Sequence, residues 1–153
     1  RTRSAPAAVT GAVREAVRIP LAVKIGPYFS SMANMARRLC DAGAAGLVLF
    51  NRFLQPDILL DRISAQPTMS PSVPSEALLP LRWLALLHGR VRAHLAATTG
   101  VWTAEDAVKL LLAGADVTMM ASALFRHGPD HLGVVLEGMR TWLDEHEYAS
   151  VSS

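Results

Sequence analysis

The strongest constraint on the fold is a unit that occurs twice in the sequence. Leu39–Asn51 (LCDAGAAGLVLFN) and Leu111–Ser122 (LLAGADVTMMAS) each run from a helix end through an Ala-Gly pair into an apolar stretch that ends on a polar side chain. The glycine is expected to take the left-handed conformation that closes the helix. The apolar stretch resembles a parallel strand that is covered on both faces. The repeated unit therefore predicts an α/β fold with a parallel sheet.

The rest of the chain continues this alternation. Four segments predict strands: Leu21–Gly26, Gly46–Asn51, His94–Thr99 and Asp116–Ser122. Five segments have helical periodicity: Ala7–Val17, Ser31–Asp41, Glu76–Leu87, Ala104–Ala113 and Leu132–His146. Residues 53–75 contain four prolines and predict a long loop over the strand ends, for which we expect a lid role. We expect residues 1–153 to form one domain.

Two architectures accommodate four βα units. A complete (β/α)8 barrel takes about 250 residues, or about 31 per unit, so a chain of 153 residues with an insertion holds four units. The chain is then either half of an eight-stranded barrel or a small, open, doubly wound sheet. A GxGxxG motif is absent from the sequence, which weakens the doubly wound alternative.

Composition excludes several classes of protein. Hydrophobic residues make up 51% of the chain and charged residues 18%, which excludes a disordered chain. The net charge is +2 without a run of like charges, so a nucleic-acid partner is not expected. The longest apolar run, Ala42–Phe50, is about half of what a membrane span needs. The single cysteine, Cys40, favours a cytoplasmic location.

Polar residues end or interrupt the predicted strands at Lys24, Asn51, Thr99 and Ser122. The carboxyl ends of parallel strands meet at one edge of the sheet, so we expect these residues to share a site. Lys24 lies between apolar residues and needs a partner, which is an anion, an electron-rich ring or an ion pair at the barrel mouth. Asn51 either reads the edge of a heterocycle or caps a turn.

Two neighbouring loops have the composition of a phosphate site. Thr99 and Gly100 precede a helix, and Ala121 and Ser122 end the last predicted strand. Thr103 and Asp106 have the spacing of a capping box at that helix start. Small residues with exposed amides predict a phosphate cradle, and the alternative is a pair of ordinary tight turns. No metal-binding motif occurs in the sequence, so no metal is expected.

Several motifs occur together in a recognisable order. These are KIGPYF from Lys24, LVLFN ending at Asn51, and ATTGVWTAEDAVKLLLAGAD followed by MMASAL between Ala96 and Leu124. The combination resembles the flavin-binding half of the dihydroorotate dehydrogenases, in particular the branch called dihydroorotate dehydrogenase-like proteins. The resemblance implies the carboxy-terminal half of an FMN-binding TIM barrel, with strands five to eight.

The resemblance also implies roles for individual residues. The implied cofactor-binding residues are Lys24, Asn51, Thr99, Gly100, Ala121 and Ser122. Asn51 and Arg52 would bind the substrate. Lys24 would stabilise negative charge at the pyrimidine edge of the flavin ring. The pairs Thr99–Gly100 and Ala121–Ser122 would hold the phosphate, mostly through backbone amides.

The implied function is that of a flavin oxidoreductase of pyrimidine biosynthesis that acts on CH–CH bonds. Hydride would pass between flavin and dihydroorotate or a similar dihydropyrimidine. Thr99 departs from the glycine usual in the family, and Arg52 replaces a small hydroxyl residue. The family's catalytic base and first four strands have no counterpart here, and Cys40 lies too late in the chain to be that base. The chain alone is therefore expected to be inactive.

Three other interpretations stay open. In the first, the chain is a catalytically silent fragment. In the second, it is a half-barrel that associates with a second copy of itself. In the third, it is a phosphate-binding lyase or isomerase that uses Lys24 as a Schiff-base amine.

Overall fold

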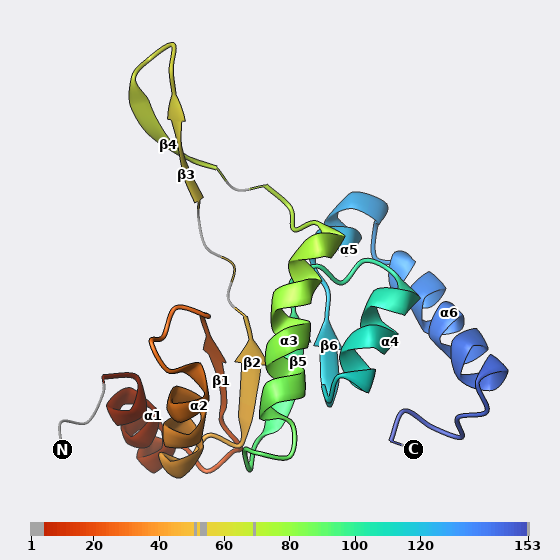
Figure 1. Cartoon of the computed structure of the whole chain (residues 1–153), viewed down its shortest axis with the longest axis horizontal. Coiled ribbons are helices and arrows are strands. Elements are labelled where there is room, and N and C mark those ends of the chain that lie inside the picture. The colour runs from red at the N-terminus through yellow and green to blue at the C-terminus, as the bar shows by residue number, and fades with distance from the viewer. Residues whose placement is uncertain (1–4, 51, 53–54, 69, 153) are drawn as a thin grey trace.

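The computed structural model describes residues 5–50, 52, 55–68 and 70–152. A parallel sheet and the helices beside it form the main body (Figure 1). The strands of this sheet are β1 (Ala22–Ile25), β2 (Gly46–Leu49), β5 (His94–Thr98) and β6 (Val117–Met119). The helices are α1 (Ala5–Ala16), α2 (Met32–Asp41), the 3-10 turn η1 (Pro74–Ala77), α3 (Leu78–Leu87), α4 (Ala104–Leu112), α5 (Ser122–His127) and α6 (His131–Glu145). All four predicted strands and all five predicted helices are present.

The order of the strands decides between the two predicted architectures. The sheet has the order β1-β2-β5-β6, with every neighbouring pair parallel. A doubly wound sheet reverses its strand order at a switch point, whereas a barrel adds each new strand beside the previous one. The sequential order is therefore that of half a (β/α)8 barrel, as predicted.

Only one face of the sheet is buried. The row Ile25–Leu49–Ala97 crosses three paired strands and lies in the core with side chains of α2, α3 and α4. The neighbouring row contains Lys24 and Val117, which are exposed, with half-buried residues between them. The helices thus cover one face, while the opposite face corresponds to the interior of a barrel.

The two predicted helix closures have the same geometry. Gly43 and Gly114 both have φ of +103°, a conformation that residues with a side chain rarely adopt. The amide of Gly43 donates to Cys40 O at 2.9 Å, and the amide of Gly114 donates to Leu111 O at 2.9 Å. In each case the next amide also donates back into the helix, at 3.0 Å, which completes a Schellman motif. The repeated αβ unit is confirmed in detail.

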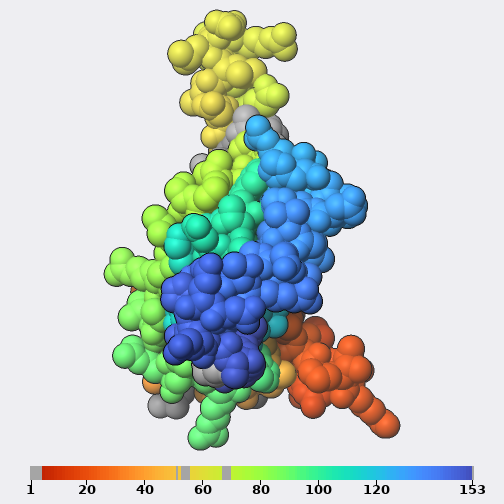
Figure 2. Space-filling view, turned by 90° about the vertical axis from the view of Figure 1, so that its right-hand side faces the viewer, coloured from red at the N-terminus to blue at the C-terminus, as the bar shows by residue number. Residues whose placement is uncertain are grey.

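The insertion differs from the predicted loop. Residues 55–68 form an antiparallel hairpin of β3 (Gln55–Leu59) and β4 (Ser64–Thr68). The hairpin extends away from the body, as Figures 1 and 2 show. Its two prolines, Pro56 and Pro67, stand opposite each other in a ribbon that has only edge strands, where a missing amide donor is tolerated. Among the described residues of the insertion, Ser72, which follows the hairpin, reaches the strand ends.

None of the helices in the described ranges is both long and apolar enough to cross a membrane.

Candidate functional site

The carboxyl ends of the strands enclose a cavity of about 140 Å³. Six residues predicted for the site line it: Lys24, Arg52, Thr99, Gly100, Ala121 and Ser122. These residues come from the carboxyl-terminal part of β1 and from the segments that follow β2, β5 and β6, so the structure brings together positions as far apart as 24 and 122. The seventh predicted residue, Asn51, lies outside the described residues.

Five residues of the same cavity were not predicted. They are Ser72, Thr98, Val101, Met119 and Met120. Thr98, Val101 and Met120 adjoin predicted positions and Met119 lies two residues before Ala121, so the strand assignment could have suggested them. Ser72 comes from the insertion, and no local sequence signal places it beside residue 122.

Lys24 lies in edge strand β1 on the uncovered face of the sheet, and its side chain is exposed. None of the described residues forms an ion pair with it. The ion-pair alternative for Lys24 thus finds no partner among the described residues, and water can hydrate the exposed ammonium group instead. Its charge is therefore available to a ligand at the strand ends.

Thr99 and Gly100 form a strained turn at the end of β5. Both have positive φ, +83° at Thr99 and +78° at Gly100. This conformation is a genuine outlier for a β-branched residue such as threonine. The Thr99 hydroxyl donates to Phe50 O at 3.4 Å, so it is directed to the neighbouring strand end rather than committed to the cavity. A Cβ at residue 100 would collide with the backbone of Ala77, which explains the glycine there.

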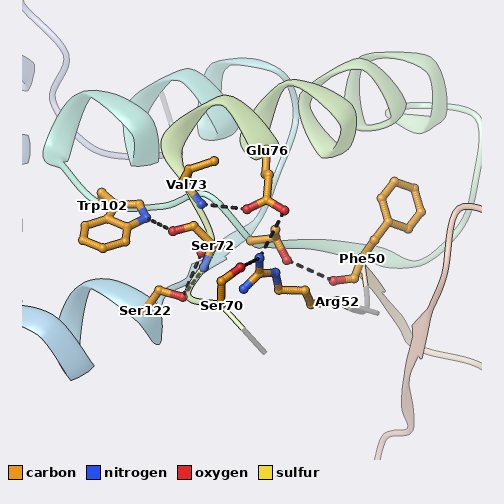
Figure 3. Close-up of polar contacts among 9 residues, drawn as sticks. Phe50, Arg52, Ser70, Ser72, Val73, Glu76, Trp102 and Ser122 are labelled. Carbon is orange, nitrogen blue, oxygen red and sulfur yellow. Dashed lines mark hydrogen bonds and ion pairs between the residues drawn. The ribbon is translucent and has the colours of Figure 1, made fainter. Parts of the chain in front are cut away.

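Ser122 is held by the insertion. The Ser72 amide donates to Ser122 Oγ at 2.9 Å, and the two hydroxyl oxygens are also 2.9 Å apart (Figure 3). Trp102 Nε1 donates to Ser72 O at 2.9 Å. Ser72 is buried, with 6% of its surface exposed. A residue after the hairpin therefore takes part in the wall of the strand-end cavity.

Arg52 connects the end of β2 to the start of η1. Its Nη2 lies 3.5 Å from Glu76 Oε1 and donates to Ser70 Oγ at 3.5 Å (Figure 3). Glu76 Oε2 also accepts from the Val73 amide at 2.6 Å. Arg52 and Thr99 line a second cavity of about 310 Å³, which extends toward Tyr28. The guanidinium group thus stands between the two cavities.

The predicted capping box is present at α4, and it occupies backbone amides that a ligand could otherwise use. The Asp106 amide donates to Thr103 Oγ1 at 3.2 Å, and Asp106 Oδ2 accepts from the amides of Thr103 and Trp102 at 3.1 Å each. These amides were expected to be exposed to a ligand. Because Asp106 takes them up, the donors at this helix start are fewer than predicted.

Cys40 stands apart from the site. It lies in α2 and is half-buried. Burial raises the pKa of its thiol, with a smaller contribution from Asp41, so the reactive thiolate is disfavoured at neutral pH. Cys40 is not among the residues that line the strand-end cavity.

A larger cavity, of about 540 Å³, lies at the opposite ends of the strands. It is lined by α4, α6 and the C-terminal segment, with Trp142 and Tyr148 among its side chains. Its described lining contains neither lysine nor arginine. In barrels of this kind the amino ends of the strands serve stability, whereas ligands bind at the carboxyl ends. The smaller cavity is therefore the better candidate site.

The chemistry of the strand-end cavity is that of an anion site. Lys24 and Arg52 supply positive charge, Ser72, Thr98 and Ser122 supply hydroxyl groups, and no carboxylate is among its described lining residues. Cations and hydroxyl donors together suit a phosphate or carboxylate group. Fold and site thus define a half-barrel of the (β/α)8 class whose strand-end cavity is lined by two cationic side chains and several hydroxyl groups.

Comparison with known proteins identifies the relatives of this half-barrel. The chain is 32% identical over 145 residues to a putative dihydroorotate dehydrogenase A (fumarate) of Aeropyrum pernix, covering 92% of the chain and 46% of that protein. It is 32% and 33% identical to the catalytic subunits of dihydroorotate dehydrogenase B (NAD(+)) of Pelobacter propionicus and Geotalea uraniireducens. Those two matches each cover 94% of the chain and 48% of the relative. No protein-family model matches the chain.

The chain is therefore a homologue of the dihydroorotate dehydrogenases, and the predicted resemblance is confirmed. It spans about half the length of the curated relatives that it matches. This share agrees with the four-stranded sheet, which is half of a barrel.

Proposed function

We propose that the chain is the carboxy-terminal half of an FMN-dependent oxidoreductase of the dihydroorotate dehydrogenase type. In this proposal the strand-end cavity holds the phosphate end of FMN. The observation that carries it is the convergence of Lys24, Thr99–Gly100 and Ala121–Ser122 on one cavity with anion-binding chemistry. The named activities of the relatives support the same reaction class.

The residues of the cavity fit one part of FMN. The volume of about 140 Å³ is below the range of about 300–1,000 Å³ that is usual for whole small-molecule sites, so the cavity suits a phosphate group rather than the complete cofactor. The hydroxyls of Thr98, Ser72 and Ser122 would donate to phosphate oxygens. Lys24, on the uncovered face, would favour negative charge on the bound cofactor.

FMN, when bound, would supply the hydride chemistry of the reaction. Arg52, held by Glu76, would orient the carboxylate of a dihydropyrimidine substrate together with Asn51. Oxidation of a CH–CH bond also releases a proton, and Cys40 cannot receive it because it lies in α2 with a raised pKa. We therefore expect this chain to bind cofactor without turning over substrate. A cytoplasmic location and a small-molecule substrate, with no nucleic-acid partner, belong to the same proposal.

The chain offers a matched pair of variants for a test, since Lys24 and Lys109 are its two lysines and both are exposed. Lys109 lies in α4, away from the strand ends. Binding of FMN and of riboflavin, which lacks the phosphate, is measured by flavin fluorescence at low and high salt.

FMN is expected to bind more tightly than riboflavin, with the difference decreasing at high salt. Lys24→Met should weaken FMN binding about fivefold, as expected for a solvent-exposed charge pair, and Lys109→Met should leave it unchanged. Equal binding of the two flavins would refute the phosphate site, and equal effects of the two lysine variants would refute the role of Lys24 in cofactor binding.

A further inference from the structure

The segment Ser70–Val73, named here the strap, reaches the strand-end cavity through Ser72. Ser72 is one of the two buried polar residues among the described positions. Its amide, hydroxyl and carbonyl each take part in a hydrogen bond of 2.9 Å, the first two with Ser122 and the third with Trp102. The position of the strap over the cavity therefore depends on these two partners.

The two serine hydroxyls leave one donor for a ligand. Ser122 Oγ already accepts the Ser72 amide, and the two hydroxyl oxygens share one proton between them at 2.9 Å. The other hydroxyl proton has no partner within the pair, and both hydroxyls line the cavity. The pair can thus donate one hydrogen bond to an anion as long as Ser72 stays in place.

Trp102 holds Ser72 without lining the cavity itself. Its indole N–H is the group among the described residues that donates to Ser72 O. The backbone of Trp102 is fixed in turn, because its amide donates to Asp106 Oδ2 at 3.1 Å and its carbonyl lies 2.8 Å from His131 Nε2. The edge of the ring system also contacts His127, with ring centroids 5.8 Å apart. The backbone bonds and the ring contact thus support the indole while its N–H is directed at the strap.

We propose that Trp102 is a positioning residue of the anion site. Its indole N–H holds the strap so that the Ser72–Ser122 pair donates to the phosphate group of the ligand. This inference rests on the proposed function, since it assumes a phosphate-bearing ligand at the strand ends. Without the indole donor, the buried carbonyl of Ser72 loses its partner, and the strap detaches more readily.

The test compares Trp102→Phe with Trp142→Phe. Trp142 stacks on His146 and Tyr148 at the other end of the molecule, so its replacement removes a tryptophan without touching the strap. Two quantities are measured for each variant: hydrogen exchange of the strap by mass spectrometry, and the dissociation constants of FMN, riboflavin and inorganic phosphate.

Trp102→Phe should increase exchange in the strap and weaken FMN and phosphate binding about tenfold, with riboflavin binding unchanged. Trp142→Phe should change neither. If exchange in the strap of Trp102→Phe is unchanged, the inference is wrong but the proposed function stands. The same holds if FMN and riboflavin lose affinity equally, which would indicate a merely structural role for Trp102. If the wild-type chain binds neither FMN nor phosphate, the proposed function fails and the inference fails with it.

A measurement on the wild-type chain covers the case in which Trp102→Phe does not fold. The indole proton of Trp102 is followed by NMR while phosphate or FMN is added. Slower exchange of this proton with phosphate or FMN, but not with riboflavin, supports the inference. The same exchange rate with and without phosphate overturns it.

Discussion

Replacement of Thr99 by glycine should stabilise the protein. Thr99 has φ of +83°, where a β-branched side chain crowds the backbone, and glycine adopts this conformation without strain. The relief is about 2 kcal/mol. Against it stand the Thr99 hydrogen bond, which at 3.4 Å is worth about 0.5 kcal/mol, and about 0.5 kcal/mol for the greater freedom of glycine in the unfolded chain. The net gain is about 1 kcal/mol.

This gain is measurable by thermal and urea unfolding. For a chain of 153 residues it corresponds to a rise in Tm of about 3 °C. Thr99→Ala is the matched control, because it removes the hydroxyl but keeps the Cβ, and we expect no gain from it. Gly100→Ala should destabilise by about 3 kcal/mol, since its Cβ would lie 2.9 Å from that of Ala77. A lower Tm for Thr99→Gly than for the wild type would refute the argument from strain.

Other substitutions test the remaining contacts. Gly114→Ala should cost more than about 2 kcal/mol in urea unfolding, because its Cβ would collide with the His88 ring, whereas Gly89→Ala, also at positive φ but in open space, should cost about 1 kcal/mol. The pKa of Asp116 is lowered from 3.8, first by a hydrogen bond from a backbone amide of β5 and also by a neighbouring histidine. Its stabilisation is therefore present above about pH 4 and lost as pH falls through the lower, folded pKa, so Asp116→Ala should cost about 1 kcal/mol at pH 7 and flatten the acid part of the stability curve. Ile63→Lys, at a site 89% exposed on the hairpin, should change unfolding by less than about 0.5 kcal/mol, and a larger loss would show that the hairpin packs on the body.

The parts of the fold that the sequence predicts well are those governed by local chemistry. Gly43 and Gly114 close their helices through backbone bonds within a few residues, and the Thr103–Asp106 capping box depends on a spacing of three. Such features require only the short segment in which they occur. The sequential order of the strands follows from the repetition of these segments.

The parts that sequence reasoning missed depend on distant contacts. Ser72 meets Ser122 across 50 positions, and no periodicity or motif encodes that distance. The hairpin was missed because prolines at positions 56 and 67 argue against a strand. They are tolerated here because both strands of a two-stranded hairpin are edge strands. The exposure of Lys24 depends on whether anything covers its face of the sheet, which composition alone does not determine.

The outer edge of β1 has a consequence for how binding depends on concentration. In the described part of the chain β1 ends the sheet, so Lys24 has a paired strand on one side only. A site completed by a strand added at this edge would couple ligand binding to the association of two polypeptide segments. If those segments were separate molecules, dilution alone would lower the occupancy of the site, and ligand would in turn strengthen the association.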